Sequence, residues 1–196
     1  MADGIPPAEQ PPGHTEWDGA AYQKQFDDLA ASGAEVHGET DLIMKLCPES
    51  VLDVGCGTGR VAAELQRRGV LVVGIDRDRS MITTARTLAP DVEFMVVDAA
   101  DADLGRTFDL VAMAGNVPLF TPEGTQDALL AGCARHLAVG GRLVAGFQLG
   151  RGYPIETYDQ HCSMAGLVLN DRWSSWDQGE FTPDSEYAVS VHRRTA

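Results

Sequence analysis

The stretch VLDVGCGTGR, residues 51–60, places three glycines at alternate positions directly after an apolar run. Glycine weakens the interior of a strand, so this spacing needs a physical reason. Either the chain turns tightly at this point, or a ligand approaches the backbone more closely than a Cβ atom would allow.

Apolar segments and helical patterns alternate after this stretch. The pattern predicts buried strands at 50–55, 70–76, 92–100, 108–116 and 142–149, with helices between most of them. Such alternation predicts a parallel sheet that is covered on both faces. Beyond Gly152 the pattern changes: residues 158–166 fit a short helix or a turn. Two further strands, at 166–177 and 186–194, have no helix between them and predict an antiparallel hairpin.

Composition narrows the class of protein. The 196 residues carry a net charge of −14, which disfavours a nucleic-acid partner because phosphates would be repelled. No apolar stretch approaches the roughly 20 residues of a membrane span. The four cysteines lack the spacing of a metal site and fit reduced thiols, so we expect a cytoplasmic protein without a bound metal.

Polar groups follow the expected carboxyl ends of four strands. Asp53 lies at the end of the first strand, Asp76 closes the second, Asp98 the third, and Asn116 follows the fourth. In an open α/β sheet, ligands bind at the edge where the carboxyl ends of parallel strands meet. An acid at the end of the second strand can accept both hydroxyls of a ribose. The sequence therefore predicts a nucleotide-like ligand at this edge.

The glycine spacing argues against a nicotinamide dinucleotide. The fingerprint G-x-G-x-x-G would need glycine at position 60, where this chain has Arg60. Asp53 would also repel a pyrophosphate, whereas it would attract an ammonium group. A nicotinamide-dependent oxidoreductase on a related sheet is therefore the less favoured interpretation.

At these positions the chain resembles the class I S-adenosylmethionine-dependent methyltransferases. VLDVGCGTGR resembles the first motif of that family, VVGIDRDRSM the second, VEFMVVDAADADL the third and FDLVAMAGNV the fourth, while LAVGGRLVAGF resembles the turn into the fifth strand. The resemblance covers about residues 40–150. It implies a three-layer, Rossmann-like α/β sandwich whose seven-stranded, mostly parallel sheet has the order 3-2-1-4-5-7-6, with strand 7 antiparallel.

The resemblance also implies a cofactor, S-adenosylmethionine, and its product, S-adenosylhomocysteine. Asp53 would hold the amino group of the cofactor, Asp76 its ribose, and Asp98 the adenine amino group. Arg77 departs from the family pattern, because an apolar residue often covers the adenine there; its guanidinium would stack on the ring or point to solvent. The full set implied for the cofactor is Tyr22, Asp53, Gly55, Cys56, Gly57, Gly59, Asp76, Arg77, Met81, Asp98, Ala99 and Ala114.

The domain organisation follows from the same patterns. Residues 1–14 hold four of the ten prolines and predict a flexible arm, and residues 15–196 form one domain. Within it we expect a helical cap at 15–47, a cofactor-binding core at 48–150, and a substrate segment with the terminal hairpin at 151–196. Thr15 or Asp18 would cap a first helix whose apolar face carries Trp17, Tyr22, Phe26 and Leu29.

The sequence offers three candidate catalytic residues, and each also fits a structural role. Tyr22 on the first helix fits either lid contact or core packing, and Asn116 fits either an acceptor-orienting amide or a turn. His161 would be a base only if the acceptor loses a proton. Trp176 fits either a pocket wall or the face of the hairpin. We expect the acceptor to be held by the cap and by residues 150–162.

Two functions remain open from the sequence. The chain is either an enzyme that methylates a small molecule on O, N or C, or a non-catalytic module that binds S-adenosylmethionine or S-adenosylhomocysteine. The chain has no large insertion, which favours a small-molecule acceptor over a macromolecule. The pattern does not predict the oligomeric state.

Overall fold

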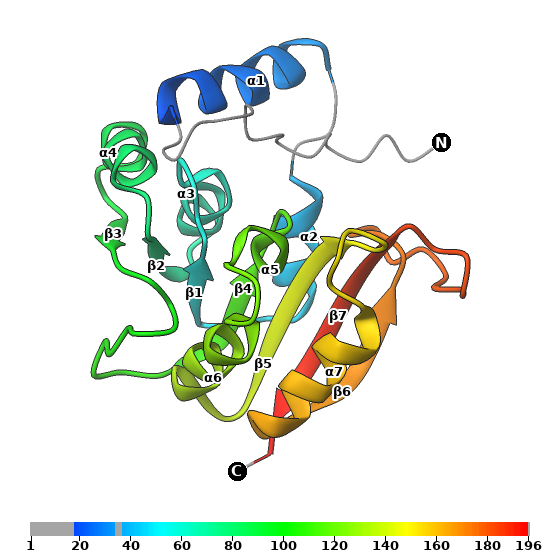
Figure 1. The fold of residues 1–196 in the computed structure, drawn as a ribbon. Coiled ribbons are helices and arrows are strands. Elements are labelled where there is room, and N and C mark those ends of the chain that lie inside the picture. Colours follow the sequence, from blue (N-terminus) through cyan, green and yellow to red (C-terminus); the bar gives the residue numbers. More distant parts are fainter. Residues whose placement is uncertain (1–17, 34–36, 196) are drawn as a thin grey trace.

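The computed structural model describes residues 18–33 and 37–195 (Figure 1). The described chain forms one sheet in the order β3-β2-β1-β4-β5-β7-β6. Neighbouring strands are parallel from β3 to β5, and β7 lies antiparallel to both β5 and β6. This topology confirms the expected Rossmann-like class. The strands are β1 (Ser50–Val54), β2 (Leu71–Asp76), β3 (Glu93–Val96), β4 (Phe108–Met113), β5 (Leu137–Gln148), β6 (Leu167–Trp173) and β7 (Tyr187–Arg194).

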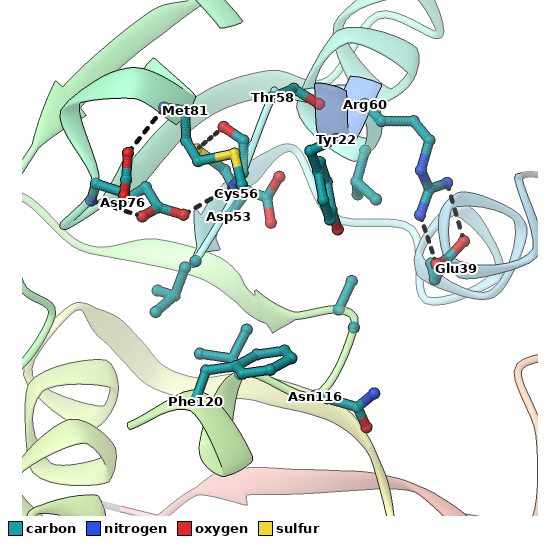
Figure 2. A pocket seen from close by; sticks show the side chains of 18 of the residues that line it. Tyr22, Glu39, Asp53, Cys56, Thr58, Arg60, Asp76, Met81, Asn116 and Phe120 are labelled. Carbon is teal, nitrogen blue, oxygen red and sulfur yellow. Dashed lines mark hydrogen bonds and ion pairs between the residues drawn. The ribbon is translucent and has the colours of Figure 1, made fainter. Parts of the chain in front are cut away.

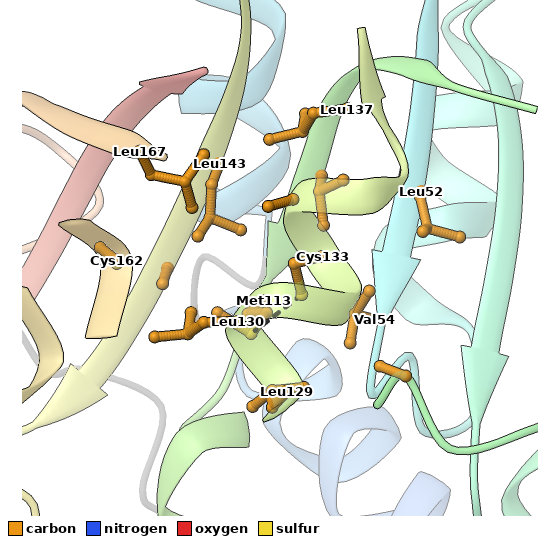
Figure 3. Close-up of a cluster of buried hydrophobic side chains, with 14 of the residues drawn as sticks. Leu52, Val54, Met113, Leu129, Leu130, Cys133, Leu137, Leu143, Cys162 and Leu167 are labelled. Carbon is orange, nitrogen blue, oxygen red and sulfur yellow. Dashed lines mark hydrogen bonds between the residues drawn. The ribbon is translucent and has the colours of Figure 1, made fainter. Parts of the chain in front are cut away.

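Helices cover both faces of the sheet, which completes the three layers (Figure 1). One buried cluster joins the sheet to α2, α3 and α4, and the other joins it to α6 and α7 (Figure 3). Along β1, Val51 enters the first cluster while Leu52 and Val54 enter the second, because successive side chains of a strand point to opposite faces. The helices are α1 (Gly19–Ala31), α2 (Gly38–Lys45), α3 (Arg60–Arg67), α4 (Arg79–Leu88), α5 (Val117–Phe120), α6 (Gln126–Arg135) and α7 (Ile155–Met164).

Local chemistry sets the ends of the helices beside β1 and β2. Gly59, with φ of 83°, precedes α3, and Gly69, with φ of 89°, follows it. The Asp78 carboxylate caps α4 by accepting from the Ser80 and Met81 amides at 2.8 and 3.1 Å. These caps start both helices close to the carboxyl ends of β1 and β2.

The bounds of several elements differ from the sequence-based expectation, most clearly those of β3, β5 and α7. β3 ends at Val96, because Asp98 turns the chain by accepting from the Ala100 amide at 3.0 Å. β5 starts at Leu137 rather than at 142, because Leu137 pairs with Phe108 before the strand bulges at its two glycines. The segment 158–166 fits either a short helix or a turn by its sequence, and in the structure most of it belongs to the helix α7, Ile155–Met164.

The first helix begins as one of the two expected caps predicts. The Asp18 carboxylate accepts from the Ala20 and Ala21 amides at 3.0 and 3.1 Å. Thr15, Trp17 and the arm expected at 1–14 lie outside the described residues. The domain boundaries expected at 47 and 150 stay predictions. In the part of the chain that the structure describes, no helix has the length and apolar character of a membrane span.

Candidate active site

A cavity of about 1770 Å³ lies at the carboxyl ends of β1, β2 and β4, between α1, α2, α5 and the loop that joins β6 to β7 (Figure 2). Small-molecule sites usually enclose roughly 300–1,000 Å³. The cavity therefore has room for two ligands side by side. Most residues expected at the site line it: Tyr22, Asp53, Gly55, Cys56, Gly57, Asp76, Arg77, Met81, Asp98, Ala99, Ala114 and Asn116.

The three alternate glycines serve different ends. Gly55, Gly57 and Gly59 have φ of 66°, 55° and 83°, a region that favours glycine. A Cβ atom on Gly55 would lie 2.7 Å from Val117, and one on Gly59 would lie 2.6 Å from Phe94. Gly59 does not line the cavity, so its absent side chain serves packing, whereas Gly55 and Gly57 bring their backbone to the cavity wall.

Asp76 is tied to the glycine turn. Its Oδ2 atom accepts from the Gly57 amide at 2.9 Å and its Oδ1 atom from the Asp78 amide at 2.8 Å. Burial raises the pKa of this carboxyl above its ordinary value, and the two backbone hydrogen bonds oppose that shift. A carboxylate offers about four acceptor positions, so each oxygen can accept a further hydrogen bond from the cavity.

Asp53 is a buried acid with an unused acceptor. Asp53 is 2 % exposed, and its Oδ2 atom has no hydrogen-bond partner among the described residues. Burial raises the pKa of Asp53 to about 7, although the charge of Arg60 and the Ala62 amide act in the opposite direction. An unpaired buried carboxylate is costly for a fold, so its position beside the cavity points to a ligand that carries a cationic donor.

α1 covers the glycine turn (Figure 1). Thr58 of the turn donates its hydroxyl to Gln23 Oε1 at 2.6 Å, and the Gly19 amide donates to Ser80 Oγ at 3.0 Å. Tyr22 lies next to Gly57 and burial raises the pKa of its phenol. The helix is thus fastened to the turn after β1 and to the start of α4.

A buried ion pair that the sequence analysis did not single out closes one end of the cavity. Both terminal nitrogens of Arg60 donate hydrogen bonds to the Glu39 carboxylate, at 2.6 and 3.1 Å. The Arg60 guanidinium lies 4.9 Å from the centre of the Phe26 ring. Both partners line the cavity (Figure 2). The pair joins the N-terminus of α2 to that of α3, and no spacing in the sequence relates two residues so far apart.

Another part of the cavity lining is a surface that we call the far wall, formed by Glu39, Asn116, Trp176, Asp177, Glu186 and Tyr187. The Trp176 indole lies against Gly146 of β5, where a Cβ atom would collide with the ring, and donates to the Tyr187 hydroxyl at 3.3 Å. The Trp176 Cβ atom lies 3.6 Å from where a Gly38 Cβ atom would stand. Trp176 therefore has both of the roles left open by its sequence: it lines the pocket and packs on the face of the sheet.

Asn116 has a fixed side-chain orientation. Its Oδ1 atom accepts from the backbone amide of Gln148 at 2.8 Å. The backbone amide of Asn116 donates to the Gly146 carbonyl at 3.0 Å. The residue is 7 % exposed and lies at the cavity edge in Figure 2. Because the oxygen is engaged by β5, the Nδ2 group is the donor that this side chain can offer to a ligand.

The segment after β5 lies elsewhere than expected. None of residues 150–162 lines the cavity, because α7 packs against α6 and β6 on one face of the sheet. His161 faces Tyr153, with 2.9 Å between its Nδ1 atom and the phenol oxygen. The β6–β7 loop lines the cavity instead, and the expectation that residues 150–162 hold an acceptor stays a prediction. The described residues contain no cluster of metal-ligating side chains.

The fold and the cavity at the strand ends define a Rossmann-like methyltransferase domain, and comparisons with known proteins identify the family. Residues 51–141 match the family model described as a methyltransferase domain. The crystal structure of a TehB-like S-adenosylmethionine-dependent methyltransferase from Corynebacterium glutamicum superposes with a TM-score of 0.86 at 34 % identity, over 90 % of this chain and 98 % of that one. The chain belongs to the S-adenosylmethionine-dependent methyltransferase family.

Relatives with named activities match a smaller region. A cypemycin N-terminal methyltransferase from a Streptomyces species is 39 % identical over 95 residues, which is 47 % of this chain and 39 % of the relative. A dTDP-3-amino-3,4,6-trideoxy-alpha-D-glucopyranose N,N-dimethyltransferase from Streptomyces venezuelae is 32 % identical over 126 residues, or 63 % of this chain and 52 % of the relative. The matches thus span about half or less of these relatives.

Proposed function

We propose that this chain transfers a methyl group from S-adenosylmethionine to a small-molecule acceptor. One observation carries the proposal: Asp53, whose buried Oδ2 atom has no partner among the described residues, and Asp76, which holds the Gly57 amide, line the same cavity. The ammonium group of an amino acid needs a hydrogen-bond acceptor such as Asp53. The two hydroxyls of a ribose need an acceptor such as Asp76.

The residues of the cavity fit this cofactor. Asp53 would accept from its ammonium group and Asp76 from its ribose hydroxyls, using the acceptor positions that Gly57 and Asp78 leave free. Met81, Asp98 and Ala99 line the cavity beyond Asp76 and would surround the adenine. The remaining residues of the expected set, Tyr22, Cys56, Arg77 and Ala114, also lie at the cavity, whereas Gly59 acts through packing.

When bound, the cofactor supplies an electrophilic methyl group: the acceptor's lone pair forms the new bond as the carbon–sulfur bond breaks, and that electron pair stays on the sulfur of S-adenosylhomocysteine. The protein has to align the acceptor and exclude water. In our proposal α1 and Tyr22 exclude water, and the Nδ2 group of Asn116 is the hydrogen-bond donor that this side chain offers at the cavity edge. His161 has no part in it, because it lies outside the cavity.

A non-catalytic binding module is the alternative. The cavity volume favours an enzyme, because about 1770 Å³ exceeds what one bound cofactor fills. One relative described above is named as an N-terminal methyltransferase and the other as an N,N-dimethyltransferase of an amino sugar, which supports methyl transfer without fixing the acceptor atom in this chain. We also keep the cytoplasmic location as a prediction.

The test is calorimetry with S-adenosylmethionine, S-adenosylhomocysteine and NADH on the wild type, on Asp76→Ala and on the exposed control Asp101→Ala. We expect the two sulfur compounds to bind with micromolar affinity, at least tenfold loss in Asp76→Ala, and no change in Asp101→Ala. Binding of NADH in their place, or no binding at all, would refute the proposal. Transfer of a labelled methyl group to an acceptor distinguishes an enzyme from a binding module.

A further inference from the structure

The charges around the cavity are strongly unequal. Of the described residues that line it, eight are carboxylic acids and three are arginines, with no lysine or histidine. Arg77 and Arg79 follow β2, beside Asp76. The third arginine, Arg60, donates hydrogen bonds from both terminal nitrogens to Glu39. The far wall itself therefore contributes acids and no cation of its own.

The two outer acids of the far wall are exposed. Asp177 and Glu186 lie on the β6–β7 loop, at the mouth of the cavity. Asp177 accepts from the hydroxyl of Ser175, and neither acid has an ion-pair partner among the described residues. Two uncompensated carboxylates at the mouth of a cleft attract cations and repel anions, and the net charge of −14 acts in the same direction.

The inner part of the far wall is aromatic and held in place. Trp176 is confined between Gly146 and Gly38, and it is hydrogen-bonded to Tyr187. Burial raises the pKa of the Tyr187 phenol, so this hydroxyl stays neutral at physiological pH. Neutral aromatic rings next to carboxylates favour a cation through both ring and charge interactions.

We propose that the acceptor is an amine that is cationic in solution, carries an apolar body, and bears no phosphate or carboxylate. Asp177 and Glu186 attract it, and Trp176 and Tyr187 contact its apolar body. The amine gives one proton to water before its nitrogen lone pair takes the methyl group, so no acid of the far wall needs to act as a base. This inference rests on the proposed methyl transfer and specifies its substrate class.

The first experiment compares matched pairs of probes. Tryptamine and 2-phenylethylamine are titrated by calorimetry into the protein saturated with S-adenosylhomocysteine, each beside its acidic partner: tryptophan and phenylalanine. Methylation of the same four compounds is followed by mass spectrometry. We expect at least one amine to bind and to be methylated, with its acidic partner at least tenfold weaker in both measurements.

The second experiment tests the two acids. Asp177→Asn/Glu186→Gln is compared with Glu180→Gln/Asp184→Asn, which removes two charges from the same loop at exposed residues that do not line the cavity. We expect the first variant to raise the KM of the amine about tenfold with kcat unchanged, and to weaken amine binding to the S-adenosylhomocysteine complex equally. The control variant should behave as the wild type.

The outcomes separate the two levels of the proposal. If S-adenosylhomocysteine does not bind, the proposed function itself fails. If S-adenosylhomocysteine binds, three outcomes refute the amine class and leave the methyltransferase proposal standing. In the first, no amine binds; in the second, an acidic partner binds as tightly as its amine; in the third, the two double variants behave alike.

Discussion

The buried carboxyl group of Asp53 lowers the stability of the free protein and is the group that we propose to hold the ammonium group of the cofactor. Its side chain is buried beside the cavity, its Oδ2 atom has no partner among the described residues, and its pKa is raised to about 7. A buried acid with a spare acceptor stabilises a bound ammonium group and destabilises the free protein. In the proposed function the same residue would therefore link stability, pH and ligand binding.

The pH dependence of stability should reveal this residue. Because the pKa of Asp53 is about 7 in the fold and near 3.8 in the unfolded chain, the folded protein holds the extra proton between these values. Its contribution to stability is therefore lost as pH rises from about 4 to 7, by on the order of 4 kcal/mol at full effect. Urea unfolding of wild type and Asp53→Asn at pH 5, 6, 7 and 8 measures this.

The wild type should lose stability relative to Asp53→Asn as the pH rises through this range. The exposed Asp91→Asn is the control and should follow the wild type. If the free energies of wild type and Asp53→Asn run parallel from pH 5 to 8, Asp53 is not the buried acid described here.

α1 acts as a cover because two hydrogen bonds fasten it to the parts it covers. One runs from Thr58 to Gln23, the other from the Gly19 amide to Ser80. Thr58 belongs to the same turn that presents Gly57 to the cavity. The cover and the glycine turn are thus mechanically linked.

Removing one of these bonds should loosen the cover. Thr58→Val keeps the shape of the side chain but leaves Gln23 Oε1 without its donor, which costs about 1 kcal/mol. We expect backbone amides of α1 to exchange with solvent about fivefold faster and S-adenosylhomocysteine to bind a few-fold more weakly. Hydrogen-exchange mass spectrometry and calorimetry measure the two effects. Thr87→Val, exposed on α4, should change neither; unchanged exchange in Thr58→Val would contradict the role of this bond.

The elements near the glycine turn were predictable from the sequence, whereas the far wall was not. Strands and helices have periodic patterns, and the carboxyl ends of parallel strands must share an edge, so Asp53, Asp76 and Asp98 could be placed together in advance. Trp176 sits in a loop without periodicity, and only the absence of a Cβ atom on Gly146, some thirty residues away, creates its place. α7 looked like a pocket element because it follows β5, but its apolar face packs into the core.

At the scale of the whole molecule, ligand binding and folding are coupled. The cavity lies between the sheet edge, α1 and the β6–β7 loop, so a ligand there contacts segments that are far apart in the sequence. A ligand that binds only the folded chain raises its stability by an amount set by its concentration relative to Kd.

S-Adenosylhomocysteine should therefore raise the melting temperature. At a concentration of one hundred times Kd the gain is about 2.7 kcal/mol. For a chain of this size the melting temperature should rise by roughly 5–10 °C. Differential scanning calorimetry with and without the ligand measures this shift, and homocysteine alone is the control. A shift that survives in Asp76→Ala would show that the ligand stabilises the fold from another site.

The far wall and the glycine turn come from different parts of the chain. Apart from Asn116, the far wall is built by the start of α2, by the β6–β7 loop and by the first residue of β7, whereas the glycine turn and its acids lie at the ends of β1 and β2. Mutations can accumulate in the loop without disturbing Asp53 or Asp76. Over evolutionary time such a protein can exchange one acceptor for another while its methyl donor stays the same, so descendants of one ancestor can share a cofactor and differ in the compounds that they methylate.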